Sequence, residues 1–386
     1  MLQAAIDQEV TDFLITHLNR VDEQGRKQVI RNGYLPAREI QTGAGPLEVS
    51  QPRVRDNLAD KSSRVHFTSS ILPRYLRRSK SIEELLPWPC LKGTSTGDFN
   101  EALQSLLGQH AANLSPNTIV QLKEKWSTEY QGFSRRDLSD KEYVYVWANG
   151  IQVNVRLESE GCQRQCMLVL IGAIPEGNKE LITVVDGYRE SEQSWYELLL
   201  DSKSRGLTLA PKLAIGDGAL GFWAAIRKVF GETREQRCWV HKTANILNKM
   251  PKSIQLKANI HNIWMAAPRV EAEKAFDLFL EKDIAKYPGA CECLRKDHDV
   301  LLTFYDFPAE HWAHLGATNP IESTFATLRL RHRKTKGSGS RRASLATMFK
   351  LGQSAEKKWR KLRGYEKIIP LIQGIKFTDG IMQDAA

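Results

Sequence analysis

Two acidic residues stand where carboxylates could hold a metal ion for phosphoryl transfer. Asp217 closes the apolar run KLAIG and precedes Gly218, so we expect its side chain at the carboxyl end of a strand, where ligand sites of α/β sheets gather. Glu322 lies near the start of a helical pattern that opens at Asn319-Pro320. Carboxylates from separate elements suit Mg²⁺, which can activate a nucleophile and stabilise a leaving oxygen.

Both acids also have a structural interpretation that the sequence leaves open. Asp217-Gly218 is a common turn pair. With Asn319 as the helix cap, Glu322 falls at the position of a capping box. The apolar side chains of this helix lie on another face, which leaves Glu322 near Arg329 and able to face either solvent or a metal–phosphate site.

A third carboxylate is missing from the place where a three-acid set needs it. The β-rich run YVYVWANG ends at Asn149 and Gly150, so an amide stands there instead. An amide offers a carbonyl oxygen but no charge to hold two divalent cations. Asn-Gly between the runs YVYVW and IQVNVRL also predicts a hairpin turn.

Positive charge is concentrated near the carboxyl end. The formal net charge is +10, and residues 329–363 contain thirteen Lys or Arg and one acid, Glu356. Such a block is the electrostatic footprint of a polyphosphate partner, although a solvated helix face is the alternative. We predict that nucleic acid contacts its first half, through Arg329, Arg331, Arg333, Lys334, Lys336, Arg341 and Arg342.

Composition excludes several protein classes. The chain has 386 residues, 41% hydrophobic and 26% charged, which is typical of globular proteins with two or three domains. It lacks an apolar run long enough for a membrane span, a secretory signal and a disulfide-like spacing of its six cysteines. We therefore expect a cytoplasmic protein with no membrane partner.

The order of patterns predicts a mixed α/β fold. Residues 1–80 read as a helix followed by extended segments, and 81–137 as short helices. These helices suit a helix-turn-helix DNA-binding domain with 116–126 as the recognition helix, or a plain helical bundle. β-rich runs and then alternating helices and strands fill 138–241, helices fill 242–310, and a final helix with basic helices fills 311–386.

Motifs along almost the whole chain resemble the mutator-type bacterial insertion-sequence transposases, which have an RNase H-like DDE catalytic core. The matching stretches run in family order from about residue 25 to 380. They include RNGYLPAREIQTG, LKGTSTGDF, YVYVWANGIQVNVRLE, DGYRESEQSW, KLAIGDGALGFWAA, CWVHKTANILNKMP, DFPAEHW and TNPIESTFATLRLR.

The resemblance implies roles for particular residues. The acidic triad would fall on Asn149, Asp217 and Glu322, with the helices of 242–310 inserted between the second and third positions. Cys238 and His241 would be the supporting Cys-x-x-His. The resemblance further implies Mg²⁺ or Mn²⁺, hydrolysis at terminal inverted repeats, strand transfer to target double-stranded DNA, a homo-oligomer on DNA and a nucleoid-associated location.

The chain departs from the family pattern at the first acid. The family has Asp where this chain has Asn149, and usually His where it has Gln152; the stretch KGSGSRR also differs. We predict weakened or absent catalysis, because metal-dependent cleavage relies on that charge. The alternatives are a catalytically inactive DNA-binding protein that occupies transposon ends, and a junction or repair nuclease of similar fold.

Two further signals stay open. Cys238 and His241 could join Cys291, Cys293 and His298 in a zinc site, but the spacing is not regular, so support of the catalytic domain or the DNA end is the other interpretation. Asp186 in VVDGYRES is the rival acid for the triad, and an Asp-Gly turn is its alternative.

Overall fold

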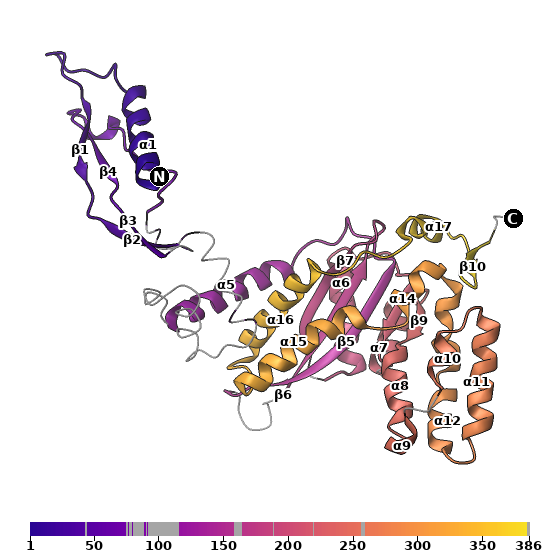
Figure 1. Ribbon diagram of the computed structural model, residues 1–386. Coiled ribbons are helices and arrows are strands. Elements are labelled where there is room, and N and C mark those ends of the chain that lie inside the picture. The colour runs from indigo at the N-terminus through magenta and orange to yellow at the C-terminus, as the bar shows by residue number, and fades with distance from the viewer. Residues whose placement is uncertain are drawn as a thin grey trace. The chain divides into compact units, whose positions relative to one another are not determined.

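The protein forms two compact units, Met1–Gln121 and Leu122–Ala386. The computed structural model (Figure 1) describes residues 1–42, 45–74, 76, 79, 89, 91, 116–157, 164–187, 189–218, 220–255 and 259–383. Among these residues, no helix has the length and apolar character needed to cross a bilayer.

The first unit contains a helix and two small two-stranded sheets. Helix α1 spans Leu2–Thr16. Strand β1 (Val29–Tyr34) pairs with β4 (Pro52–Asp56), and β2 (Arg38–Thr42) pairs with β3 (Gly45–Val49), both antiparallel. Buried Ile6 of α1 packs with Ile40, Val49 and Leu72. The predicted helix followed by extended segments is therefore confirmed.

The predicted helix-turn-helix domain lies largely outside the described residues, because 81–88, 90 and 92–115 are not described. Its final part is helix α5, Pro116–Ser134, which runs without a break through the predicted recognition segment 116–126. In the second unit, Tyr130 and Phe133 of α5 contact the ring of Phe349 at centroid distances of 5.7 and 4.7 Å.

A five-stranded mixed sheet is the centre of the second unit, so the predicted mixed α/β architecture is confirmed. Its order is β7-β6-β5-β8-β9. Strands β5 and β6 pair antiparallel, as do β6 and β7, whereas β5, β8 and β9 are parallel. The bounds are β5 Tyr145–Asn154, β6 Arg164–Ala173, β7 Lys179–Gly187, β8 Leu213–Gly216 and β9 Arg234–Arg237.

The predicted hairpin turn at Asn149-Gly150 is wrong. Strand β5 is continuous through both residues, and they pair with Val169 and Leu168 of β6. The long uninterrupted ladder and the burial of the neighbouring apolar residues decide the conformation, because tertiary packing overrides the local preference of an Asn-Gly pair. Asn149 therefore lies inside a strand and not at the end of one.

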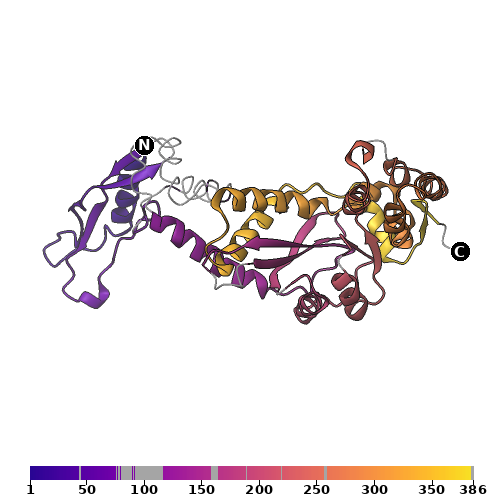
Figure 2. The ribbon, with the colours of Figure 1, turned by 90° about the horizontal axis from the view of Figure 1, so that it is seen from below.

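Helices cover both faces of the sheet (Figures 1 and 2). Helices α6 (Glu192–Ser204) and α7 (Leu220–Val229) cover one face. Trp195 of α6 and Phe222 of α7 pack there with strand residues such as Ala148 and Leu168 in the main buried core. Helices α15 (Asn319–Thr335) and α16 (Arg341–Glu356) lie on the other face. Any side chain of β5 therefore faces one of two distinct helical layers.

The described elements between β9 and α15 are helices, as predicted for 242–310. They gather beside the β9 edge of the sheet (Figure 1). Their bounds are α8 Trp239–Leu247, α9 Lys252–Gln255, α10 His261–Trp264, α11 Arg269–Asp283, α12 Pro288–Arg295, α13 His298–Leu301, η3 Thr303–Asp306, η4 Ala309–His311 and α14 Trp312–Leu315.

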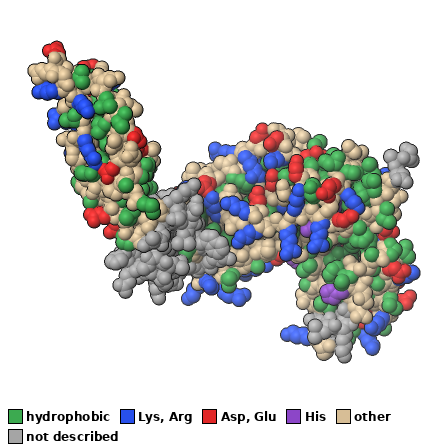
Figure 3. All heavy atoms as spheres, turned by 45° about the horizontal axis from the view of Figure 1, so that its top comes forward, with side chains coloured by type: hydrophobic (Ala, Val, Ile, Leu, Met, Phe, Trp, Pro, Cys, Tyr) green, Lys and Arg blue, Asp and Glu red, His purple; other side chains and the backbone are tan. Residues whose placement is uncertain are grey.

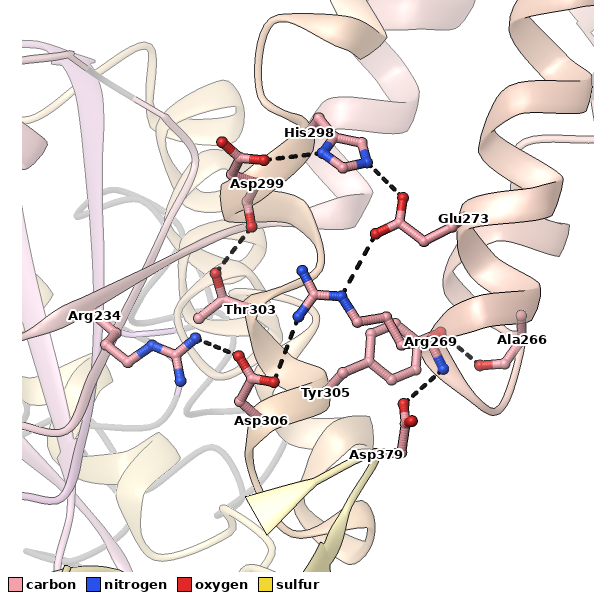
Figure 4. A network of polar contacts seen from close by, with 10 residues as sticks. All are labelled: Arg234, Ala266, Arg269, Glu273, His298, Asp299, Thr303, Tyr305, Asp306 and Asp379. Carbon is pink, nitrogen blue, oxygen red and sulfur yellow. Dashed lines mark hydrogen bonds and ion pairs between the residues drawn. The ribbon is translucent and has the colours of Figure 1, made fainter. Parts of the chain in front are cut away.

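Ion pairs connect these helices to the sheet edge (Figure 4). Asp306 of η3 pairs with Arg234 of β9 at 2.5 Å and with Arg269 of α11 at 3.4 Å. Glu273 of α11 then contacts Arg269 at 3.5 Å and His298 at 2.6 Å. We call these five residues the helical joint. Because each charge in it has an opposite charge beside it, it holds α11, α13 and β9 together.

Candidate active site

The register of the parallel strands brings Asn149 and Asp217 to neighbouring positions. Ala148 of β5 is the partner of Gly216, the last residue of β8, so Asn149 and Asp217 follow at the point where this pairing ends. The predicted placement of Asp217 at the carboxyl end of a strand is thus confirmed. Adjacent strands lie about 4.8 Å apart, so the two side chains belong to the same neighbourhood.

Gly218 leaves room for an arginine directly after the acid. Its φ is +85°, a conformation that favours glycine, and a Cβ there would lie 0.7 Å from Nη1 of Arg237. The buried Arg237 guanidinium also pairs with Asp297 at 3.4 Å. The Asp-Gly pair therefore serves a close packing contact as well as the turn that the sequence predicts.

Glu322 is not a helix cap, so the capping-box interpretation is wrong. The cap position of α15 is Thr318, one residue earlier than predicted, and it makes no side-chain capping bond. The Glu322 carboxylate instead accepts a 2.6 Å hydrogen bond from Nδ2 of Asn149. Residues 149 and 322 are far apart in sequence, and α15 brings them together across the sheet face.

Two basic side chains complete the surroundings of Glu322. His241 Nε2 lies 3.4 Å from Oε1, and Arg329 Nη1 lies 3.2 Å from Oε2. The hydrogen bond from His241, reinforced by Arg329, lowers the pKa of Glu322 to about 2, although partial burial opposes this shift. The carboxylate is therefore ionised at any physiological pH. We call Asn149, Asp217, His241, Glu322 and Arg329 the acid site.

Cys238 and His241 support this site from α8. Cys238 Sγ lies 3.3 Å from His241 Nδ1 and accepts from the backbone N–H of Thr318 at 3.4 Å. The Cys238 contact, and then Glu322, raise the pKa of His241 well above its ordinary value. Burial opposes ionisation of the Cys238 thiol, but hydrogen bonds from His241 lower its pKa. A charged imidazole thus connects the start of α15 to the Glu322 carboxylate.

The other zinc-site residues of the sequence prediction lie elsewhere. Cys291 and Cys293 are on α12, and His298 contacts Glu273 and Asp299 in and beside the helical joint. Among the described residues, no three His, Cys, Asp or Glu side chains are grouped so that they could hold a metal ion. The predicted pairing of Cys238 with His241 occurs as a direct contact between the two side chains.

A further acid near Asp217, which sequence reasoning missed, is Glu190. A Cβ on Gly150 would lie 2.7 Å from Glu190 Cδ, so the carboxyl group rests against the strand. Side chains alternate across a strand, so Glu190 lies on the face opposite Asn149. Burial, and then the charge of Asp217, raise the pKa of Glu190 to about 7.

The Glu190 carboxyl group lacks part of the hydrogen bonding that a buried carboxyl needs. Its group accepts a bond from the Gly150 backbone, but Oε1 is buried with no hydrogen-bond partner among the described residues. The glycine directly after Asn149 was the signal that could have pointed to a close approach here. Asp186, the rival acid of the same segment, ends up on β7 and contacts Arg341 Nη2 at 2.7 Å.

The predicted nucleic-acid contacts divide into two groups. Arg331 is buried, Arg341 is held by Asp186, and Arg342 contacts Glu124 at 3.2 Å. Arg329 is exposed beside Glu322, and Arg333, Lys334 and Lys336 are exposed on the last turns of α15 and at its end. Figure 3 shows patches of Lys and Arg side chains on one face of the second unit.

Comparison with known proteins gives one consistent result. The model of the Mutator family of transposases matches residues 1–361. The transposase for insertion sequence element IS6120 of Mycolicibacterium smegmatis is 48% identical over 301 residues, which cover 78% of this chain and 92% of that protein. The transposase for element IST2 of Acidithiobacillus ferrooxidans is 49% identical over 292 residues, which cover 73% and 95%.

A more distant relative extends the match. The transposase for element IS256 in transposon Tn4001 of Staphylococcus aureus is 27% identical over 357 residues, which cover 86% of this chain and 87% of that protein. The match of the family model to almost the whole chain agrees with these similarities, and the chain belongs to the Mutator family of transposases.

Proposed function

We propose that this protein is the DNA transposase of an insertion sequence, acting by metal-dependent cleavage at terminal inverted repeats and strand transfer to target DNA. The observation that carries the proposal is the hydrogen bond between Asn149 of β5 and Glu322 of α15, with Asp217 directly after β8, the strand that pairs with β5, in a chain of this family. The strand order around them supports an RNase H-like core of the DDE type.

The residues that would hold Mg²⁺ or Mn²⁺ are Asp217 and Glu322, with the amide oxygen of Asn149 at the third position. All three offer oxygen, which fits a hard divalent cation in kind. A bound ion would activate water or a 3′-hydroxyl and stabilise the leaving oxygen. The fit is weaker in charge, because Asn149 contributes none and its Nδ2 donates to Glu322.

We propose that this substitution impairs catalysis. An aspartate at 149 would repel Glu322 until a cation lay between the two carboxylates. Asn149 instead donates to Oε1 at 2.6 Å, while Arg329 occupies Oε2 at 3.2 Å. Both oxygens of Glu322 thus have protein donors, and a cation must displace them with less total charge to attract it.

Double-stranded DNA is the proposed substrate and partner. We propose that the protein binds it as a homo-oligomer in the cytoplasm. Glu322 lies in the first turn of α15, and the far end of the helix carries the exposed cations Arg333, Lys334 and Lys336. A duplex that follows this helix would therefore pass the acid site. Arg331 is buried, and Arg341 and Arg342 are paired with Asp186 and Glu124, so these three are less available to DNA. Binding through phosphate contacts should weaken steeply with added salt.

The test restores the missing charge. Asn149→Asp should raise Mg²⁺-dependent nicking of terminal-repeat DNA by about 100-fold or more. This increase is the reverse of the loss of activity that follows removal of a group around a metal ion. Asn154→Asp is the matched control, because it adds the same charge to an exposed position of the same strand. Equal cleavage by the unmodified chain and Asn149→Asp would refute the impairment.

The second candidate function is an inactive transposase-derived protein that occupies transposon ends. The Asn149–Glu322 hydrogen bond favours it, because that bond holds the acid site together without a cation. This function predicts tight binding to terminal repeats by the unmodified chain and no nicking by it at any Mg²⁺ or Mn²⁺ concentration. Structure-selective cutting without preference for the repeats would instead indicate a general nuclease.

A further inference from the structure

A basic cavity of about 450 Å³ adjoins the first turns of α15. Its lining includes Lys179, His314, Lys358, Trp359, Arg360 and Arg363, and none of its described lining residues is acidic. We call it the Trp359 pocket. The residues at the amino end of α15 also line it, so the positive end of a 17-residue helix adds to its field.

His314 lines the pocket, and its pKa reflects burial and the charges around it. Burial, and then the charges of Lys179, His311, Arg363 and Arg360, lower the pKa of His314 to about 4. Lys179, Arg360 and Arg363 line the pocket beside this imidazole, so the space there is positive. Such a space favours an anion, because a negative ligand relieves the mutual repulsion of the lining cations.

An unsatisfied donor also points to a ligand. The indole Nε1–H of Trp359 is buried and has no acceptor among the described residues. An indole nitrogen can only donate, so it needs an oxygen that the described residues do not supply. An unpaired buried donor destabilises the folded protein, and a phosphate oxygen in the pocket could accept this bond.

The pocket and the acid site lie on the same face of the sheet. Trp147 and Asn149 are two residues apart on β5, so their side chains point to the same side. Trp147 Nε1 donates to the carbonyl of His314 at 3.1 Å, and its ring lies 5.7 Å from the Lys179 amine. Ser323 and Pro320, which line the pocket, flank Glu322 in sequence.

We propose that the Trp359 pocket binds a backbone phosphate of the DNA strand whose neighbouring nucleotides reach Glu322. This inference rests on the proposed function. It adds a phosphate-binding site that determines which phosphodiester bond of the DNA lies at the acid site. Arg360 and Arg363 supply exposed cations, and the Trp359 N–H adds direction. The pocket is distinct from the exposed cations at the end of α15, which would follow the duplex without fixing its register.

The test combines a substitution in the pocket with a neutral phosphate in the DNA. A terminal-repeat duplex carries a single methylphosphonate, moved one position at a time, and its affinity is measured by fluorescence anisotropy at several salt concentrations. For the unmodified chain, we expect one position near the cleavage point at which neutralisation weakens binding about tenfold. Arg360→Gln should remove the extra sensitivity at that position and lower the salt slope by about 1.

Two further variants sharpen the test. Lys357→Gln is the matched control, because Lys357 is an exposed cation of the same segment that does not line the pocket. It should leave the methylphosphonate position unchanged. Trp359→Phe keeps an aromatic ring but removes the N–H, and it should weaken binding at the same position by about fivefold, the effect of one lost hydrogen bond.

Several outcomes would overturn the inference. One is that Arg360→Gln behaves like Lys357→Gln, and another is that the sensitive position persists in Arg360→Gln. Inorganic phosphate that displaces DNA far better than chloride at equal ionic strength would assign the pocket to a free anion. A duplex of unrelated sequence separates the two proposals. If the protein binds this duplex as tightly as the terminal repeats, and Arg360→Gln still removes the sensitivity to the methylphosphonate, the proposed function is refuted and the phosphate pocket is not.

Discussion

The helical joint and the acid site are both clusters of charged side chains, yet they are organised differently. In the joint, Asp306 and Glu273 each lie between basic groups, and no carboxylate of the joint lies against another in the contacts described. Near the acid site, the Glu190 carboxyl is buried within the field of Asp217 and retains an unbonded oxygen. Carboxylates that are all paired with cations are typical of a structural connection, whereas a buried carboxyl with a raised pKa beside a second acid, as at Glu190, is typical of a functional site.

The largest expected effect is at Glu322. In the Asn149→Asp background, Glu322→Gln should reduce nicking by about 100-fold or more, because it removes a proposed metal ligand. It should also move the pKa of His241 back toward its ordinary value, since the imidazole loses its ionised partner. NMR titration of His241 measures this second effect independently of activity.

A carboxylate of the helical joint, Asp306, provides the control for Glu322→Gln. Asp306→Asn removes a carboxylate of the helical joint, and it should leave nicking unchanged at temperatures where the protein stays folded. A similar loss of nicking in Asp306→Asn would contradict the separation of the two clusters into a structural one and a functional one.

The next largest effect concerns Glu190. Its pKa is raised to about 7, above the ordinary value of 4.5, so the folded state holds a proton that the unfolded state releases. The stability that this difference provides falls as pH rises from about 4.5 to 7. Glu190→Gln should therefore raise the free energy of unfolding above pH 7, without divalent cations, by on the order of 1–3 kcal/mol.

Chemical denaturation at pH 5 and pH 8 in the presence of a chelator measures the Glu190 effect. Glu192→Gln is the control, because Glu192 is half-exposed and pairs with Lys228 at 2.5 Å on the surface. A Glu190→Gln variant with the same pH profile as the unmodified chain would show that this carboxyl is not held at a raised pKa.

A smaller loss of stability is expected in the joint itself. Asp306→Asn removes the ion pairs with Arg234 and Arg269, although Arg269 keeps Glu273, and partly exposed pairs of this kind contribute up to about 1 kcal/mol each. We expect a decrease of about 1 kcal/mol in the free energy of unfolding, measured by urea denaturation. Glu271→Gln, which breaks a local surface pair with Lys274, should cost less than about 0.5 kcal/mol.

The smallest effect is the titration of His298. Burial opposes its charge, but hydrogen bonds with Asp299 and Glu273 raise the pKa of His298. Its contribution to stability is fully present below the unfolded-state value of 6.5 and is lost as pH rises through the folded-state pKa. Because the ring is about a third exposed, the change should stay below about 1 kcal/mol.

Unfolding measurements between pH 5.5 and 9 check this prediction. His298→Asn should flatten the decline in stability across that interval. The same decline in the variant and the unmodified chain would assign the pH dependence to other groups.

Particular residues show where sequence reasoning succeeded and failed. The apolar run before Asp217 placed that acid correctly, because a buried strand must end where polar residues begin. The Asn149-Gly150 pair was misassigned to a turn, and Asn319 to a helix cap, because both interpretations used only neighbours in the chain. Glu190 was missed because nothing near it in sequence indicates that Gly150 receives its carboxyl group.

By itself, the sequence determined the mixed α/β pattern, the helices after residue 242, the basic block and the family resemblance. Hydrophobic periodicity, net charge and motif order are local or additive properties, so they can be read along the chain. Only the tertiary structure decided that Asn149 donates to Glu322, that Arg331 is buried and that a cavity forms beside Trp359. Those facts depend on contacts between distant segments, which packing of the whole sheet and its helices selects.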